Sequence, residues 1–180
     1  MELKEAIMTR RTVRKFADKA VSKETMTEII SLAAYVPSWK NSQTARWNVV
    51  TDRTVIKRIA TEATMGFEHN KEIILGCPCL VIQSAVTGRC GYERDGSFST
   101  SQGSGWEMYD SGIAAQTFSL AAHDAGLGSV IMGIIDDKKI AEIINLPDTE
   151  RVTAAIAVGY PAEEPKCPPK KSAKEITRFI

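Results

Sequence analysis

The stretch that decides the fold is WEMYDSGIAAQTFSLAAHDAGLGSVIMG, residues 106–133. It predicts a long helix from about Trp106 to Asp124, closed by Gly126. The run SVIMGII that follows predicts a strand that meets Gly133. One side of the helix is crowded with small residues: Ser111, Gly112, Ala114, Ala115, Ser119 and Ala122. Small side chains let another helix or a flat ligand approach closely, so we expect this helix to be central and tightly packed.

Other elements are expected on both sides of this stretch. Helices are predicted near Leu3–Ile7, between an N-cap at Ser22 and the stop at Pro37, after an N-cap at Asp52, and in DDKKIAEIINL. Strands are predicted in WNVVTD, in CLVIQSA, which is apolar enough to be buried on both faces, and in RVTAAIAVGYP. Helices and strands mix without a regular βαβ repeat, which favours an α+β fold in a single domain over residues 1–180.

Composition and charge exclude several classes of function. Lys and Arg number 23 against 22 Asp and Glu, for a formal net charge of +1. No global basic field exists to hold nucleic acid or an anionic membrane, so we expect neither as a partner. No apolar stretch approaches the ~20 residues that span a bilayer, and the N-terminus resembles no signal peptide. These features predict a cytoplasmic protein.

The cysteines and histidines do not predict a metal site. Cys77 and Cys79 form a C-x-C pair that lacks the paired spacing of zinc ligands, so buried reduced thiols are favoured. Metal binding by Cys77, Cys79 and Cys90 stays a distant alternative. The sequence assigns no role to these three thiols or to Cys167.

Two segments lack periodic apolar residues. Residues 87–105, rich in Gly and Ser, predict a long loop that is either a flexible lid over a site or a disordered surface loop. Residues 162–180 predict an extended C-terminal arm outside the core of its own domain, although Ile176, Phe179 and Ile180 need apolar cover.

Two polar clusters are candidates for ligand binding. In TRRTVRKF, residues 9–16, Arg10 and Arg14 would share one face if the first helix continued, with the hydroxyl of Thr12 between them, while Arg11 would point elsewhere. Two guanidinium groups and a hydroxyl suit a phosphate. A solvated surface run of arginines is the alternative. VPSWKNSQ, residues 36–43, follows the second helix and carries side chains that both donate and accept hydrogen bonds. Cations at one end and amides at the other suit a heteroaromatic cofactor with a phosphate.

Four segments in order resemble the FMN-dependent nitroreductase family. They are LKEAIMTRRTVRKF, VSKETMTEIISLAAYVPSWKNSQ, DSGIAAQTFSLAAHDAGLGSVIMG and AAIAVGYPAEEPKCPPKKSAKEI. The resemblance implies a central, mixed, mainly antiparallel sheet flanked by helices, and a homodimer that exchanges its C-terminal tails and holds two FMN sites at the interface. The residues that match cofactor-binding positions are Arg10, Arg11, Thr12, Arg14, Pro37, Ser38, Trp39, Asn41, Gln116, Met132, Gly133, Lys170 and Lys171.

The same resemblance implies roles for these residues. Arg10, Thr12 and the tail lysines match positions that hold the FMN phosphate, and Arg14 matches one that faces the pyrimidine edge of the flavin. The Ser38 turn matches a segment supplied by the partner subunit, and Gln116 lies where the family places part of the flavin pocket. Met132 and Gly133 match the turn whose backbone N–H points at flavin N5. No side chain is implied as a general acid or base.

The implied activity is ping-pong hydride transfer from NAD(P)H, through flavin N5, to a small acceptor such as a nitroaromatic, a quinone or a flavin. Two alternatives stay open. One is a family enzyme of narrower specificity, a dehalogenase or an ene-reductase. The other is a protein that stores or senses flavin. The sequence distinguishes neither NADH from NADPH nor one acceptor from another.

Overall fold

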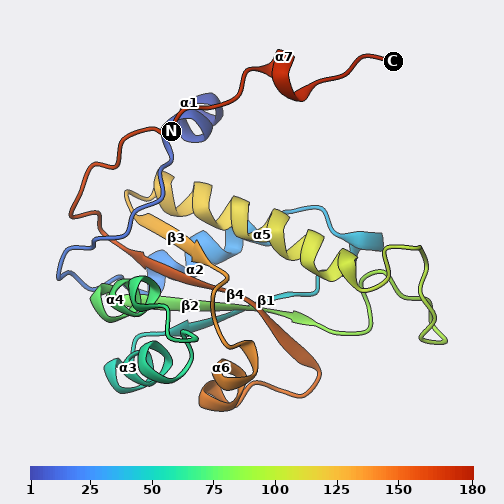
Figure 1. Cartoon of the computed structure of the whole chain (residues 1–180), viewed down its shortest axis with the longest axis horizontal. Coiled ribbons are helices and arrows are strands. Elements are labelled where there is room, and N and C mark those ends of the chain that lie inside the picture. Colours follow the sequence, from blue (N-terminus) through green and yellow to red (C-terminus); the bar gives the residue numbers. More distant parts are fainter.

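A single four-stranded sheet lies between two layers of helices (Figure 1). The computed structural model describes residues 1–180. The strands are β1 (Ala45–Val50), β2 (Cys79–Val86), β3 (Gly128–Met132) and β4 (Glu150–Gly159), in the spatial order β1-β2-β4-β3. All three pairings are antiparallel, which confirms the α+β prediction. The prediction of a mixed sheet is wrong for this chain, because the parallel pairing is limited to one bridge between Thr12 and Ser129.

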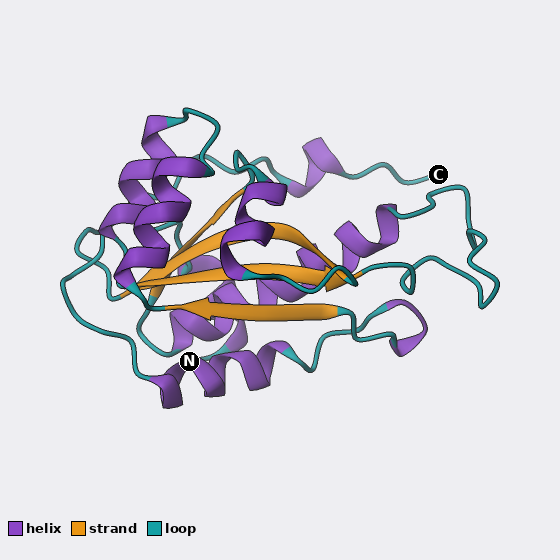
Figure 2. Cartoon of the chain, turned by 90° about the horizontal axis from the view of Figure 1, so that it is seen from below, coloured by secondary structure: helices purple, strands orange, loops and turns teal.

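The helices divide between the two faces of the sheet. They are α1 (Leu3–Thr9), α2 (Lys23–Ala33), the 3-10 turn η1 (Trp39–Asn41), α3 (Arg53–Glu62), α4 (Glu68–Gly76), α5 (Gly105–Asp124), α6 (Asp137–Ile144) and α7 (Ala173–Ile176). Helices α2 and α5 cover one face, and α3, α4 and α6 cover the other. Figure 2 shows the four strands side by side and the C-terminal segment leading away from them. None of the helices combines the length and the apolarity that crossing a bilayer requires.

Local signals explain where several helices begin. The hydroxyl of Ser22 accepts a hydrogen bond from the backbone N–H of Thr25 at 3.0 Å, and Asp52 accepts one from Thr54 at 2.7 Å. Both predicted N-caps are therefore confirmed. Helix α4 was not predicted, because its N-cap position holds Phe67, which makes no side-chain capping bond.

The core forms two clusters, one on each face of the sheet. Leu80 and Ile82 of β2 join the cluster under α3, α4 and α6. Cys79 and Val81 of the same strand join the cluster under α2 and α5. This alternation confirms that β2 is buried on both faces.

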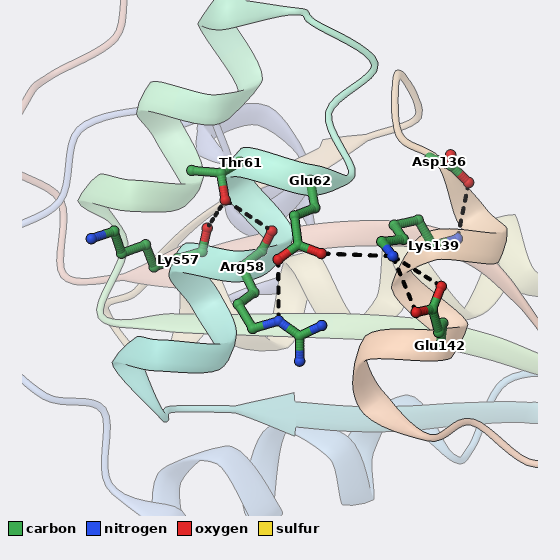
Figure 3. Close-up of polar contacts among 7 residues, drawn as sticks. All are labelled: Lys57, Arg58, Thr61, Glu62, Asp136, Lys139 and Glu142. Atoms are coloured by element: carbon green, nitrogen blue, oxygen red, sulfur yellow. Dashed lines mark hydrogen bonds and ion pairs between the residues drawn. The ribbon is translucent and has the colours of Figure 1, made fainter.

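Ion pairs join α3 to α6 on the outside of the second layer (Figure 3). Lys139 Nζ lies 3.7 Å from Glu62 Oε2 and 3.0 Å from Glu142 Oε2. Arg58 Nε lies 3.2 Å from the other oxygen of Glu62. Because these groups are exposed, the network contributes little to stability and stands apart from the candidate site.

Candidate functional site

The cationic segment, residues 10–14, lies against the free edge of β3. The N–H of Val13 donates to the carbonyl of Ser129 at 3.1 Å, next to the bridge between Thr12 and Ser129. The side chain of Val13 is buried and lies over Gly128. This packing places Arg10 to Arg14 beside the first residues of β3.

The start of the C-terminal arm is tied to the same segment. One carboxylate oxygen of Glu163 accepts hydrogen bonds from the backbone N–H of Arg14 at 2.8 Å and of Lys15 at 3.3 Å. The N–H of Ala162 donates to the carbonyl of Lys15 at 3.0 Å. Sequence reasoning missed Glu163, because nothing in AEEP distinguishes an acid that binds backbone from one that faces solvent.

Together these contacts create a cationic pocket of about 700 Å³. It is lined by Ile7, Met8, Arg10, Arg11, Thr12, Arg14, Pro165, Lys166, Cys167, Pro168 and Lys170. The predicted residue Lys171 does not line it. The structure thus brings five of the predicted residues together although Lys170 is far from the others in the sequence.

Most polar groups of this pocket are free of partners within the chain. The side chains of Arg10, Arg14 and Lys170 make no ion pair or hydrogen bond, and neither does the hydroxyl of Thr12. Arg11 differs, because its Nη1 donates to the carbonyls of Met8 at 2.7 Å and of Arg10 at 2.9 Å. The structure therefore uses Arg11 to cap the end of α1, which leaves Arg10, Arg14, Lys166 and Lys170 for an anion.

The second predicted cluster forms a tight turn around η1. Lys40, Asn41 and Gln43 have φ values of 44°, 54° and 47°, in the left-handed region. The hydroxyl of Ser38 accepts from the N–H of Gln43 at 3.0 Å, which closes the turn. Pro37 precedes it and is exposed. The indole of Trp39 packs on that of Trp106, with ring centroids 4.8 Å apart, and its buried Nε1 has no hydrogen-bond partner.

The two clusters lie at opposite ends of α5. Trp39 contacts Trp106 in the first turn of the helix, whereas Thr9 Oγ1 lies 2.8 Å from Nε2 of His123 in the last turn. A helix of 20 residues is about 30 Å long. Trp106 and His123 are 17 residues apart in this helix, so the two groups of predicted residues lie roughly 25 Å from each other along its axis in one chain.

The remaining predicted residues lie near α5 and β3. Met132 is buried in the core, while Gly133 is exposed with open space around its Cα. Since β3 rises about 3.3 Å per residue, Gly133 lies roughly 13 Å along the strand from Ser129. Gln116 is exposed on the outer face of α5, beside Tyr109 and Ile113.

Burial controls the titration of the thiols. It raises the pKa of Cys77 to about 12 and that of Cys79 to about 11. Cys167 is exposed at the cationic pocket. The expectation of buried reduced thiols is confirmed for Cys77 and Cys79.

A larger pocket of about 900 Å³ lies between α2 and the end of α4. Its Arg53 already donates to the carbonyls of Cys77 and Leu75, both at 2.6 Å. We place the candidate site at the smaller cationic pocket, because only there do several cations lack partners.

The protein belongs to the α+β class, because four antiparallel strands are covered by helices, with the long helix α5 on one face. It has a candidate anion site, the cationic pocket at the edge of the sheet. The family model described as "Nitroreductase family" matches residues 7–160. The chain therefore belongs to the nitroreductase family and is an oxidoreductase of that family.

Individual proteins agree with this assignment. A protein of Thermus thermophilus named "NADH dehydrogenase" is 28% identical over 187 residues, covering 91% of this chain and 89% of that protein. The crystal structure of a nitroreductase family protein from Clostridium novyi NT is 28% identical, with a TM-score of 0.78 over 93% of this chain and 89% of that one. A structure described as an FMN-dependent nitroreductase from Clostridium difficile R20291 is 24% identical, with a TM-score of 0.79 over 98% of each chain.

Proposed function

We propose that this chain is an FMN-dependent oxidoreductase that passes hydride from NAD(P)H to a small acceptor, a nitroaromatic, a quinone or a flavin, by a ping-pong cycle. We propose further that it works as a homodimer with two FMN sites at the interface. The names of relatives support the cofactors, since one is called an NADH dehydrogenase and another FMN-dependent.

The observation that carries the proposal is the set of free donors in the cationic pocket. Arg10, Arg14, Lys170 and the hydroxyl of Thr12 lack partners in the chain and line one cavity. A phosphate monoester carries close to two negative charges and accepts several hydrogen bonds, so it matches this donor set. Arg10, Thr12 and Lys170 therefore fit the phosphate end of FMN, which leaves Arg14 for the pyrimidine edge.

The separation of the two clusters supports the dimer. The Ser38 turn and the Arg10 pocket lie roughly 25 Å apart along α5, so one chain does not bring the two clusters together. A second copy running in the opposite sense would bring its turn to the first copy's pocket. Exposed apolar side chains lie where such a copy would pack: Leu3, Ile7 and Met8 on α1, and Met108 and Tyr109 on α5.

The C-terminal arm fits the same arrangement. Ile176 is 69% exposed and Phe179 is 94% exposed, so neither packs on its own chain. Exchange of the arms between subunits would bury both side chains.

When bound, FMN supplies a hydride acceptor and donor at N5. The chain supplies position and charge. Arg10, Thr12 and Lys170 would hold the phosphate, Arg14 would stabilise negative charge at the pyrimidine edge, and the backbone at Met132 and Gly133 would donate toward N5. No side chain is assigned as a general acid or base.

The test is a visible spectrum of the purified protein before and after anaerobic addition of NADH or NADPH. Flavin absorbance that bleaches supports the reductase and identifies the preferred donor. Bound flavin that bleaches with neither donor contradicts the reductase, and failure to take up added FMN contradicts the cofactor assignment.

A further inference from the structure

Two segments that are separate in the sequence meet at one buried carboxylate. Asp110, on the second turn of α5, is 6% exposed and has no ion-pair partner. Its Oδ2 accepts a hydrogen bond from the backbone N–H of Trp39 at 2.8 Å and another from the thiol of Cys90 at 3.0 Å. The first donor belongs to the turn at Ser38–Gln43, and the second belongs to the 87–105 loop.

We propose that Asp110 is a positioning residue whose carboxylate joins the Ser38–Gln43 turn to the 87–105 loop, so that the two segments form one wall of the flavin site. This inference rests on the proposed function, because it takes the Ser38 turn as part of that site.

Other contacts connect the same two segments. Lys40 Nζ lies 3.1 Å from Oε1 of Glu93 in the loop. The indole of Trp106, which packs against Trp39, donates from Nε1 to the hydroxyl of Thr100 at 2.9 Å. The loop thus contacts the turn directly at Glu93 and is linked to it indirectly at Cys90, through Asp110, and at Thr100, through Trp106.

The central contact requires a side-chain oxygen that accepts hydrogen bonds from both segments. An ionised carboxylate only accepts hydrogen bonds, and a buried one is tolerated only where donors surround it. The thiol of Cys90 is such a donor, since burial and the nearby charge of Asp110 raise its pKa to about 12 and keep its proton on sulfur. Because Lys40, Asn41 and Gln43 all take left-handed backbone conformations, the turn needs external contacts to hold its shape.

The experiment compares the wild type with Asp110→Ala, Asp110→Asn and Ser119→Ala. The last is a matched control, because Ser119 is also buried on α5 but bonds only to the carbonyl of Ala115, far from the turn. FMN affinity is measured by fluorescence titration of the apoprotein, and backbone protection by hydrogen exchange with mass spectrometry.

We expect Asp110→Ala to weaken FMN binding by about tenfold or more. Asp110→Asn should recover much of this loss, because its amide oxygen still accepts from Trp39. Exchange in Asp110→Ala should rise in residues 38–43 and 90–99 while strands β2 and β4 stay protected. Ser119→Ala should match the wild type in both measurements.

Equal FMN affinity in Asp110→Ala and Ser119→Ala, or exchange that rises uniformly over the chain, overturns the inference. If Asp110→Ala fails to fold, Cys90→Ala replaces it, and unchanged exchange in residues 90–99 then overturns the inference, because this variant removes the bond between the loop and Asp110. Failure of the wild type to bind FMN refutes the proposed function and the flavin role of Asp110 together. The exchange data then decide whether Asp110 joins the two segments.

Discussion

Replacing Gly128 by Ala perturbs the contact that fixes the cationic segment on the sheet. A Cβ at this position would lie 2.6 Å from Cβ and 2.6 Å from Cγ2 of Val13. Carbon atoms pack at about 3.5–4.0 Å, so Val13 would have to retreat by roughly 1 Å. Because Val13 is 4% exposed, this retreat strains the core and weakens the hydrogen bond from its N–H to Ser129.

Overpacking of this kind costs about 1–3 kcal/mol. For a domain of this size, such a loss lowers Tm by about 2–12 °C. Since Thr12 precedes Val13, Gly128→Ala should also weaken FMN binding. The assays are thermal unfolding and FMN titration, with Gly76→Ala as the control, because a Cβ at Gly76 meets nothing within 4 Å.

Second-site variants sharpen this test. Val13→Gly removes the Cβ in the contact and should partly restore FMN binding to Gly128→Ala, whereas Val13→Ala leaves the 2.6 Å contact in place and should not. A Gly128→Ala protein with the wild-type Tm and FMN affinity would refute the reasoning.

Three further results are expected. Burial, and then the charges of Arg10 and Arg11, lower the pKa of His123 in the folded protein from its usual 6.5. The neutral imidazole therefore contributes to the free energy of unfolding above about pH 6.5, and this contribution is lost as pH falls from there toward the folded pKa. His123→Gln should remove that pH dependence from denaturant titrations. Bound FMN should raise the pKa of His123 in an NMR titration, because its phosphate neutralises the two arginines. A His123 pKa that does not change with FMN argues against a phosphate in the cationic pocket. In a thiol assay of the native protein near pH 8, only Cys167 should react rapidly, because burial raises the pKa of the other three thiols to between about 11 and 12, and rapid reaction of a second thiol contradicts the described burial. A chain truncated before Lys170 should lose FMN affinity and dimer in gel filtration, and a truncated chain that stays dimeric and yellow would disprove the role of the arm.

Local sequence signals predicted the elements whose stabilising contacts are themselves local. The caps at Ser22 and Asp52 act within three residues, and the small residues of α5 mark the helix that packs centrally. Helix α4 escaped prediction, because its N-cap position holds Phe67 and its stability comes from packing against the core.

The sequence also indicated which residues to examine for a site, since Arg10, Thr12 and Arg14 are close together in the chain and Lys170 belongs to a conspicuous basic pair. It could not show that Arg11 turns back to cap α1 while its neighbours stay free. That difference depends on the direction of each side chain at the end of the helix. Glu163 and Asp110 were missed for a similar reason, because their partners lie 149 and 71 residues away.

By itself, the sequence determined the α+β class, the central helix and the type of residue available to bind an anion, because composition and periodicity are local properties. The tertiary structure alone decided the antiparallel sheet order, the pocket that joins Lys170 to the arginines, and the distance between the two clusters. These features depend on contacts between distant segments. The length of α5 is what places the clusters at opposite ends, and this is the physical reason that the proposed site needs a second copy of the chain.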